Sequence, residues 1–313
     1  MRQLYCGILG LSVAVAFFNL FIFYKKGWHT IMNIGFIGAG KVGFSLGKYF
    51  SLNSINITGY YSKNIESAKL AAQFTNSKPY TNLKDLIKDS DILILAVPDK
   101  VIGEVWVDMK SLCIKDKIIC HTSGSISSDV FSDIDSLGAF GYSIHPMYAF
   151  SNKYTSYKEL KGSYFSIEGN AKFLNTIEII LQNCNLNTFT IDKKDKALYH
   201  AANVTASNLV LGIIKISCDY LKTCGLNQEE SLKALSPLII NNINNLINSG
   251  FQDALTGPIE RNDWCTVLKH IESIPKADIE LYKRLSISLL EIAREKNSNI
   301  DYTNLSNILG GDN

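Results

Sequence analysis

Four polar residues at helical spacing stand in an otherwise small and apolar stretch of the chain. They are Lys196, His200, Asn203 and Ser207. At about 100° per residue these positions form one polar stripe along a helix. Because unpaired buried polar groups are costly, the stripe needs a polar partner. A substrate pocket would provide one, with Lys196, His200 and Asn203 as catalytic candidates and Ser207 as a substrate contact. A hydrogen-bonded seam between two helices is the structural alternative.

Further polar residues lie where predicted strands end or in loops. Ser123 and Gly124 follow one strand, and His145 ends another. Arg261 lies in a glycine–proline loop, and its guanidinium could hold a carboxylate with two parallel hydrogen bonds. We predict that these four residues bind substrate. An interdomain salt bridge is the alternative for Arg261, and a structural, hydrogen-bonded role is the alternative for His145 and for His121.

A reaction at these residues would need a cofactor nearby, and the segment 32–43 predicts one. A short apolar run ends in Gly38-Ala39-Gly40-Lys41-Val42-Gly43, and helix-forming residues follow. In a dinucleotide site the first glycine permits the tight turn, and the second lets the backbone approach the pyrophosphate. The third lets the helix pack closely on the strand, and the helix N-terminus faces the phosphates. We therefore predict that residues 38–43 bind a dinucleotide.

The second predicted strand indicates which dinucleotide is bound. NAD-binding folds place an acidic residue about 20 positions after the glycines, but here Tyr61-Ser62-Lys63 occupies that place and the first carboxylate is Glu66. A hydroxyl followed by a cation suits a 2′-phosphate, so we predict NADP. The alternative is that Lys63 is a solvated loop lysine. The predicted cofactor contacts also include Val97, Pro98 and Ser123.

Strand and helix patterns alternate from residue 32 to residue 191 and then give way to helices. Apolar runs predict strands at 34–37, 55–61, 91–97, 117–120, 141–145, 164–168 and 188–191, and helices are predicted at 41–50, 65–74, 84–88 and 101–110. Long helices are predicted at 194–221, 228–247 and 277–294, with a loop at 255–263. This order predicts a doubly wound, mostly parallel α/β sheet followed by an all-helical domain. The predicted domains are 32–191, which binds the dinucleotide, and 192–313, which binds substrate and forms the dimer.

Composition narrows the function classes. The chain has 313 residues, 46% of them hydrophobic, and a formal net charge of +2, so nothing favours a nucleic-acid partner. The seven cysteines form no C-x-x-C pair, and we expect reduced thiols in a cytoplasmic protein and no metal site.

Residues 1–31 are a separate question. The apolar run 4–24, followed by Lys25-Lys26, is long enough to span a membrane. Met32 stands directly before the first predicted strand, as a start codon would, so an over-extended start is the preferred interpretation over a membrane anchor. We therefore expect membrane association only if residues 1–31 are part of the protein.

Several of these motifs together resemble a known family. They include the glycine turn, Leu95-Ala-Val-Pro98, His121-Thr-Ser-Gly-Ser125, His145-Pro-Met147, Tyr199-His-Ala-Ala202 and Leu255-Thr-Gly-Pro-Ile-Glu-Arg261. From residue 32 onward the chain is similar to proteins that join a Rossmann-like domain to a helical domain of unknown function. These proteins are related to pyrroline-5-carboxylate reductase and to the 6-phosphogluconate dehydrogenase class. Some members serve as an alternative ketopantoate reductase.

The resemblance implies an NADPH-dependent reductase of a small keto or imino acid, with ketopantoate as the first candidate. It also implies that the helical domain forms a homodimer and that Lys196 protonates the substrate oxygen. A pyrroline-5-carboxylate-type imine reductase is one alternative. The other is a non-catalytic NADP-binding sensor or scaffold, which would have no need for a lysine directed at the nicotinamide.

Overall fold

The computed structural model describes residues 32–310 of the chain. The apolar run 4–24 and residues 311–313 lie outside this range. The described chain forms two units, the first ending at Ser207 and the second beginning at Asn208. The sequence placed the domain boundary after Ile191 instead. The difference is one helix, which follows Asp195 and whose first residue, Lys196, is hydrogen-bonded to the sheet unit.

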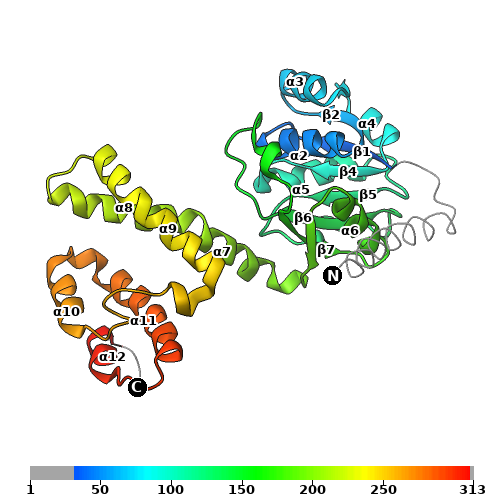
Figure 1. Ribbon diagram of the computed structural model, residues 1–313. Coiled ribbons are helices and arrows are strands. Elements are labelled where there is room, and N and C mark those ends of the chain that lie inside the picture. Colours follow the sequence, from blue (N-terminus) through cyan, green and yellow to red (C-terminus); the bar gives the residue numbers. More distant parts are fainter. Residues whose placement is uncertain (1–31, 311–313) are drawn as a thin grey trace, which may run out of the picture. The chain divides into compact units, whose positions relative to one another are not determined.

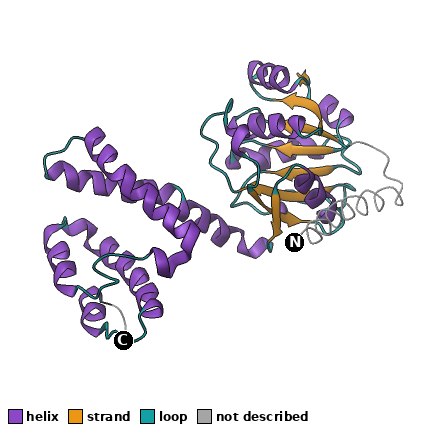
Figure 2. Ribbon diagram, viewed as in Figure 1, coloured by secondary structure: helices purple, strands orange, loops and turns teal. Residues whose placement is uncertain are grey.

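An eight-stranded sheet forms the centre of the first unit (Figure 1; Figure 2 shows its strands in orange). Its order is β3-β2-β1-β4-β5-β6-β7-β8. The strands are β1 Asn33–Ile37, β2 Asn56–Tyr61, β3 Lys78–Tyr80, β4 Ile92–Leu95, β5 Ile118–His121, β6 Phe140–Pro146, β7 Tyr164–Gly169 and β8 Asn187–Thr190. Strands β1 to β6 run parallel, β7 is antiparallel to β6, and β8 is parallel to β7. The predicted doubly wound, mostly parallel sheet is confirmed.

Helices cover both faces of this sheet. Those of the first unit are α2 Lys41–Leu52, α3 Ile65–Thr75, α4 Leu83–Asp89, α5 Asp99–Lys110, α6 Leu174–Asn183 and α7 Lys196–Ala206. One apolar core joins α2, α3 and α6 to one face of the sheet, and a second core joins α4 and α5 to the other face. Strand β4 contributes to both cores through alternate side chains, which explains why its sequence is continuously apolar.

The predicted helix 194–221 is two helices, so that prediction was wrong in part. Helix α7 ends before Ser207, whose backbone angles of φ −124° and ψ −78° are not helical, and α8 begins at Asn208. The Ser207 hydroxyl donates to the Asn203 carbonyl oxygen at 2.6 Å. Such a bond offers the backbone an alternative to the helical ladder and favours a bend. Strand β3 and helices α6, α10 and α12 were not predicted from the sequence.

The second unit is helical throughout its described part. Its helices are α8 Asn208–Thr223, α9 Gln228–Ala254, α10 Trp264–Ser273, α11 Ile279–Lys296 and α12 Thr303–Leu309. Residues from the 255–263 loop, α10, α11 and α12 form its apolar core, which includes Leu255, Val267, Leu290 and Leu305. Helix α9 continues past the predicted end and contains a break at Gly250, where φ is 79°.

Helices α8 and α9 leave much apolar surface uncovered in the single chain. Their exposed apolar side chains are Leu209, Leu211, Ile213, Leu232, Leu238, Ile240, Ile243, Ile247 and Phe251. Within residues 32–310, the stretch Lys193–Thr223 is long and apolar enough to cross a membrane by length and composition alone. That stretch is interrupted at Ser207.

Candidate functional site

The glycine turn has the geometry that a dinucleotide needs. Gly38 has φ +101° and its amide donates to the Tyr61 carbonyl oxygen at 2.8 Å. A Cβ on Gly43 would lie 2.5 Å from the Gly38 oxygen, so only glycine lets α2 pack this closely on the turn. A Cβ on Gly40 would have no atom of residues 32–310 in its way within 4 Å. The space above Gly40, at the N-terminus of α2, is therefore open for a pyrophosphate.

The N-terminus of α2 is also suited to binding an anion. No side chain caps it, and its first turn contains no acidic residue. Its unpaired N–H groups and the positive end of the helix dipole therefore remain available to an anion. Ala39 lies buried under the turn, whereas Lys41 is exposed beside it and Val42 is half-buried. These residues fit a bound dinucleotide.

An exposed lysine, Lys63, lies just after the end of β2. Tyr61 and Ser62 are half-buried, and Lys63 is exposed. Glu66, the first carboxylate after the strand, is paired with Lys69 at 2.8 Å. Among residues 32–310, no acidic group pairs with Lys63, so its ammonium is available to a ligand phosphate at the place where NAD-binding folds have an acid.

Polar side chains line one face of β6 and β7. In β6, Tyr142 and Ile144 belong to the apolar core on one face, so Ser143 and His145 face the other side. In β7, Ser166 and Glu168 occupy the same polar face, because His145 is paired with Ser166 and Ser143 with Glu168. Ser143, Ser166 and Glu168 are buried. A sheet face of this composition requires polar partners above it.

Lys196 provides one of these partners. Its side chain is 2% exposed, and its Nζ donates to the Ser143 hydroxyl at 2.6 Å and to the Ser123 carbonyl oxygen at 3.1 Å. The Ser143 hydroxyl donates to the same carbonyl oxygen at 3.1 Å. The lysine therefore joins α7, β6 and the loop after β5. Two of its three N–H protons are used in these bonds, which leaves the third for another acceptor.

Burial changes the acidity of this lysine. It lowers the pKa of Lys196 from 10.5 to about 8, while the nearby carboxylates of Glu168 and Asp99 act in the opposite direction. Both carboxylates already accept hydrogen bonds, Glu168 from Ser128 and Asp99 from Ser123. A lysine with a pKa near 8 is protonated in most molecules at neutral pH and yet gives up its proton more readily than a surface lysine.

The loop after β5 is fixed at the start of α5. The Ser123 hydroxyl donates to Asp99 at 2.8 Å, and the Ser125 hydroxyl donates to the same oxygen at 3.0 Å. Val97 is half-buried and Pro98 is exposed at the N-terminus of α5. The predicted contacts at the ends of β4 and β5 are thus brought together. The Ser123 hydroxyl already donates its proton to Asp99. If Ser123 contacts the cofactor or the substrate as predicted, it must do so through another of its atoms or through a hydrogen bond shared with Asp99.

The two strand-end histidines are neutral. Burial lowers the pKa of His121 to about 4, and its ring accepts from the Ser123 amide and contacts the Ser127 carbonyl oxygen. These bonds satisfy both ring nitrogens, which favours the structural interpretation for His121. Burial, together with Lys196 and His200, also lowers the pKa of His145 to about 4. Within the part of the chain that the structure describes, His145 has a hydrogen-bond partner for one ring nitrogen, the Tyr199 hydroxyl at 2.7 Å from Nδ1.

The rest of the α7 stripe is less buried than the sequence indicated. Lys196 is buried and His200 and Asn203 are half-buried, but Ser207 is exposed, as are the neighbouring alanines Ala201, Ala202 and Ala206. The Asn203 amide donates to the Tyr199 carbonyl oxygen at 2.8 Å. Within the first unit, only the first two turns of α7 therefore meet the sheet, and Asn203 and Ser207 hydrogen-bond to the backbone of their own helix.

Arg261 belongs to the second unit. It is exposed in the loop between α9 and α10, next to Asp263, whose pKa is lowered by hydrogen bonds from Thr266 and to a smaller extent by Arg261. The other predicted substrate contacts, Ser123, Gly124, His145 and Ser207, belong to the first unit. The role of Arg261 as a carboxylate ligand remains a prediction.

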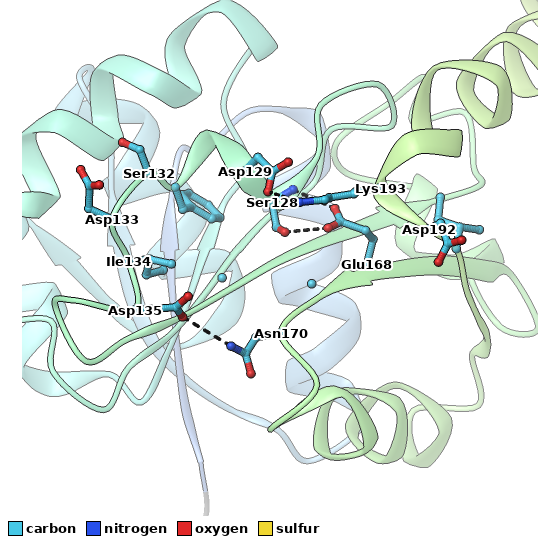
Figure 3. Close-up of a pocket in the computed structure, with 14 residues that line it drawn as sticks. Ser128, Asp129, Ser132, Asp133, Ile134, Asp135, Glu168, Asn170, Asp192 and Lys193 are labelled. Atoms are coloured by element: carbon cyan, nitrogen blue, oxygen red, sulfur yellow. Dashed lines mark hydrogen bonds and ion pairs between the residues drawn. The ribbon is translucent and has the colours of Figure 1, made fainter.

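A separate cavity of about 510 Å³ lies beside the polar face (Figure 3). Its lining includes the acidic residues Asp129, Asp133, Asp135, Glu168 and Asp192. Figure 3 shows Glu168 bonded to Ser128, with Lys193 beside Asp129. The cavity contains none of the predicted cofactor or substrate residues. Within residues 32–310, no group of three or more His, Cys, Asp or Glu side chains could hold a metal ion.

Sequence reasoning missed Ser143, Glu168, Tyr199 and Asp99 as parts of this site. The first two were detectable, since a polar residue at every second position of an apolar strand indicates a polar face. Tyr199 lies on the side of α7 that contacts β6, one position before His200 of the predicted stripe. Asp99 followed the end of a predicted strand, but its bonds to two serines depend on how β4 and β5 are paired.

Two domain families match the chain. Residues 28–146 match the Rossmann-like domain, and residues 163–289 match the domain of unknown function DUF2520. The second match begins just before β7, so it includes the last two strands, helices α6 to α10 and the first part of α11. The predicted combination of a Rossmann-like domain with a helical domain of unknown function is confirmed. A search of curated proteins found no match.

Solved structures with this architecture include three informative examples. Protein TM1727 from Thermotoga maritima is 26% identical, with a TM-score of 0.69, and the match covers 84% of this chain and 99% of that one. An imine reductase from Pseudomonas sp. is 16% identical, with a TM-score of 0.59 over 85% and 98% of the two chains. A pyrroline carboxylate reductase from Plasmodium falciparum, solved with NADP bound, is 18% identical, with a TM-score of 0.55 over 85% and 96%. The last two similarities show a shared fold.

Proposed function

We propose that this chain, in which a Rossmann-like domain is followed by a DUF2520 domain, is an NADPH-dependent reductase of a small carboxylate with a C=O or C=N group. One observation supports this more than any other. The buried ammonium of Lys196 lies at the loop after β5, in the same unit as a glycine turn that is open above Gly40. In doubly wound sheets, ligands bind at the carboxyl ends of the strands.

The proposed cofactor contacts follow from the glycine turn. The α2 N-terminus binds the pyrophosphate, and Lys63 with Ser62 binds the 2′-phosphate of the adenosine ribose. Val97 and Pro98 would border the dinucleotide at the end of β4. When bound, NADPH supplies the hydride, and the protein supplies binding, orientation and charge.

Lys196 is the proposed proton donor. Its ammonium stabilises negative charge that develops on the substrate oxygen and then donates the proton. The bonds to Ser143 and Ser123 keep Nζ in place. His200, half-buried one turn further along α7, is a proposed second contact.

Ketopantoate, reduced to pantoate in pantothenate synthesis, is the first substrate candidate. A cyclic imine such as pyrroline-5-carboxylate is the second, because imine and pyrroline carboxylate reductases share the fold. A non-catalytic NADP-binding sensor or scaffold is the alternative from a different functional class. The buried lysine argues against it, since a sensor does not need a cation with a lowered pKa at this position.

A substitution of Lys196 tests the proposal. Lys196→Met retains the volume but removes the charge and the proton, so we expect kcat to fall by ~10²–10⁴-fold, the usual effect of losing a general acid. NADPH affinity should stay close to that of the unmodified protein. Ser143→Ala is the matched control, because it removes one of the bonds that hold Lys196 but keeps the ammonium. Its effect on kcat should be much smaller.

The pH profile provides a second measurement. The donor must be protonated, so kcat should fall as the pH rises through about 8, the pKa of Lys196. If Lys196→Met retains normal turnover and only lowers the Tm, the lysine is structural. If the unmodified protein binds NADPH but reduces no keto acid or imine, the sensor alternative is favoured.

We also propose that the active form is a homodimer in the cytoplasm. The exposed apolar side chains of α8 and α9 would be covered by the second copy. A cytoplasmic location agrees with the cysteines described by the structure, which are all unpaired thiols.

A further inference from the structure

His145 lies at the carboxyl end of β6, on the polar face that also includes Ser143. Its Nδ1 is 2.7 Å from the hydroxyl of Tyr199, and the two rings meet edge to face with centroids 5.5 Å apart. Tyr199 lies on α7, three residues after Lys196, and therefore on the same side of the helix. The two α7 residues thus contact two alternate residues of β6, Lys196 at Ser143 and Tyr199 at His145.

The direction of the hydrogen bond determines the tautomer of His145. Burial raises the pKa of Tyr199, so its hydroxyl keeps its proton and needs an acceptor. The Ser166 hydroxyl lies beside the Tyr199 hydroxyl and lowers its pKa, as a hydrogen-bond donor to the phenol oxygen does, so Ser166 does not take the Tyr199 proton. Nδ1 of His145 is therefore the acceptor for the Tyr199 proton. In a neutral imidazole the other nitrogen then carries the hydrogen, which makes His145 an Nε2–H donor.

The Nε2 atom of His145 faces the loop after β5. A Cβ on Gly124 would lie 2.8 Å from Nε2 and 2.6 Å from Cδ2 of His200. Glycine at 124 is therefore required for the loop to pass this close to the two histidine rings. No residue between 32 and 310 accepts a hydrogen bond from Nε2, and His145 is only half-buried. The N–H is therefore available to a ligand.

The charged groups near His145 favour its neutral form. Lys196 and His200 lie close to it and oppose its protonation, while the carboxylate of Asp99 favours it more weakly. Asp99 accepts from Ser123 and Ser125, and Glu168 accepts from Ser128. The nearby carboxylates are thus bonded within the protein, whereas an ammonium and a neutral N–H donor have protons to offer.

We propose that His145 binds the carbonyl oxygen of the substrate through Nε2–H, and that Tyr199 is the positioning residue that fixes this tautomer. The inference rests on the proposed reductase function and names its substrate class. A carbonyl oxygen has lone pairs that accept hydrogen bonds from His145 and Lys196. The nitrogen of a neutral imine has one lone pair and can accept from only one of these groups, and a protonated imine can accept from neither. The site therefore takes a 2-oxo acid in preference to a protonated cyclic imine.

Steady-state kinetics with ketopantoate and pyrroline-5-carboxylate test the substrate class. We expect the unmodified protein to reduce ketopantoate with the higher kcat/KM. His145→Ala should lower this kcat/KM by ~10–100-fold, as expected for a lost hydrogen bond to a charged or developing oxyanion. His145→Gln can place an amide N–H near the position of Nε2 and should recover part of the loss. His270→Ala is the matched control, because His270 makes the same contact between a ring nitrogen and a tyrosine hydroxyl, with Tyr282 at 2.9 Å, but belongs to the second unit.

Nitrogen NMR of the NADP-bound protein tests the positioning role of Tyr199. In the unmodified protein the His145 spectrum should show a protonated Nε2 and an unprotonated Nδ1. Tyr199→Phe removes only the hydroxyl, so it should mix the two tautomers and lower the kcat/KM for ketopantoate by ~3–10-fold, as for a neutral hydrogen bond. A merely structural tyrosine would change the Tm without changing the tautomer.

Each negative result has a different meaning. A preference for pyrroline-5-carboxylate, or an unchanged kcat/KM for ketopantoate in folded His145→Ala, would overturn this inference and leave the reductase function in place. A protonated Nδ1 in the unmodified protein would overturn it as well. Reduction of neither substrate, nor of other small keto acids and imines, would overturn the proposed function and this assignment with it.

Discussion

The glycines of the cofactor turn have different tasks, although the sequence motif makes them look equivalent. Gly38 has a positive φ, and Gly43 lies against the turn, so both are needed for the fold of the turn itself. Gly40 has φ −76° and open space around it. Any residue could adopt this conformation, so Gly40 is required only if a ligand comes close to the backbone.

Alanine substitutions should separate these tasks. Gly40→Ala should leave the Tm nearly unchanged but weaken NADPH binding by ~10–100-fold, because a methyl group would displace the pyrophosphate from charge-assisted hydrogen bonds. Gly43→Ala should lower the stability by about 1–3 kcal/mol, as overpacking does. Gly103→Ala is the control, since Gly103 lies within α5 with open space around it. Calorimetry and thermal melts provide both readouts, and a folded Gly40→Ala protein with normal NADPH affinity would remove the case for the turn as the phosphate site.

Lys63 allows a test of cofactor preference. Lys63→Ala should weaken NADPH binding by ~10–100-fold, about the loss expected for a charged hydrogen bond, and should hardly change NADH binding. Lys69→Ala is the matched control, because Lys69 is also exposed nearby but is paired with Glu66. Titration of each variant with both cofactors gives the comparison. Equal losses for NADPH and NADH would show that Lys63 does not contact the 2′-phosphate.

At the scale of single elements, α7 and β6 explain how the candidate site is assembled. The amino-acid pattern of β6 alternates between apolar residues for the core and polar residues for the opposite face. Lys196 and Tyr199 of α7 contact that polar face at Ser143 and His145. The site therefore depends on the register between one helix and one strand.

Much of this could be predicted from sequence, because the signals are local. The glycine turn, the continuous apolar run of β4 and the polar stripe of α7 each lie within a few residues of one another, and the parallel sheet follows from their order. The break at Ser207 was not predicted, because it depends on a side-chain bond to Asn203 within an apolar stretch. The Tyr199–His145 pair was not predicted either, because it joins residues 54 positions apart.

At the scale of the whole molecule, the apolar face of α9 predicts how the protein associates. Ile240, Ile243 and Ile247 recur at helical spacing, and their side chains are 57%, 44% and 75% exposed. A row of this kind on a helix is normally covered by another protein surface.

Introducing a charge into this row should prevent dimer formation. Ile247→Glu would place a carboxylate in the proposed interface, so we expect a monomer by light scattering under conditions in which the unmodified protein is a dimer. Asn241→Glu adds the same charge to an exposed position of α9 outside the row and should remain dimeric. A monomeric unmodified protein, or a dimeric Ile247→Glu variant with normal stability, would exclude this face as the interface.

The strand order also limits the ways in which two copies can join. An open sheet ends in two border strands whose free backbone groups can recruit a strand from a neighbouring molecule, which leads to aggregation. Here the borders are β3, with three residues, and β8, with four. Strand β3 contains Pro79, which has no N–H to donate, beside the exposed Lys78. Both borders are thus poor templates for strand addition, and the sheet is protected against polymerisation.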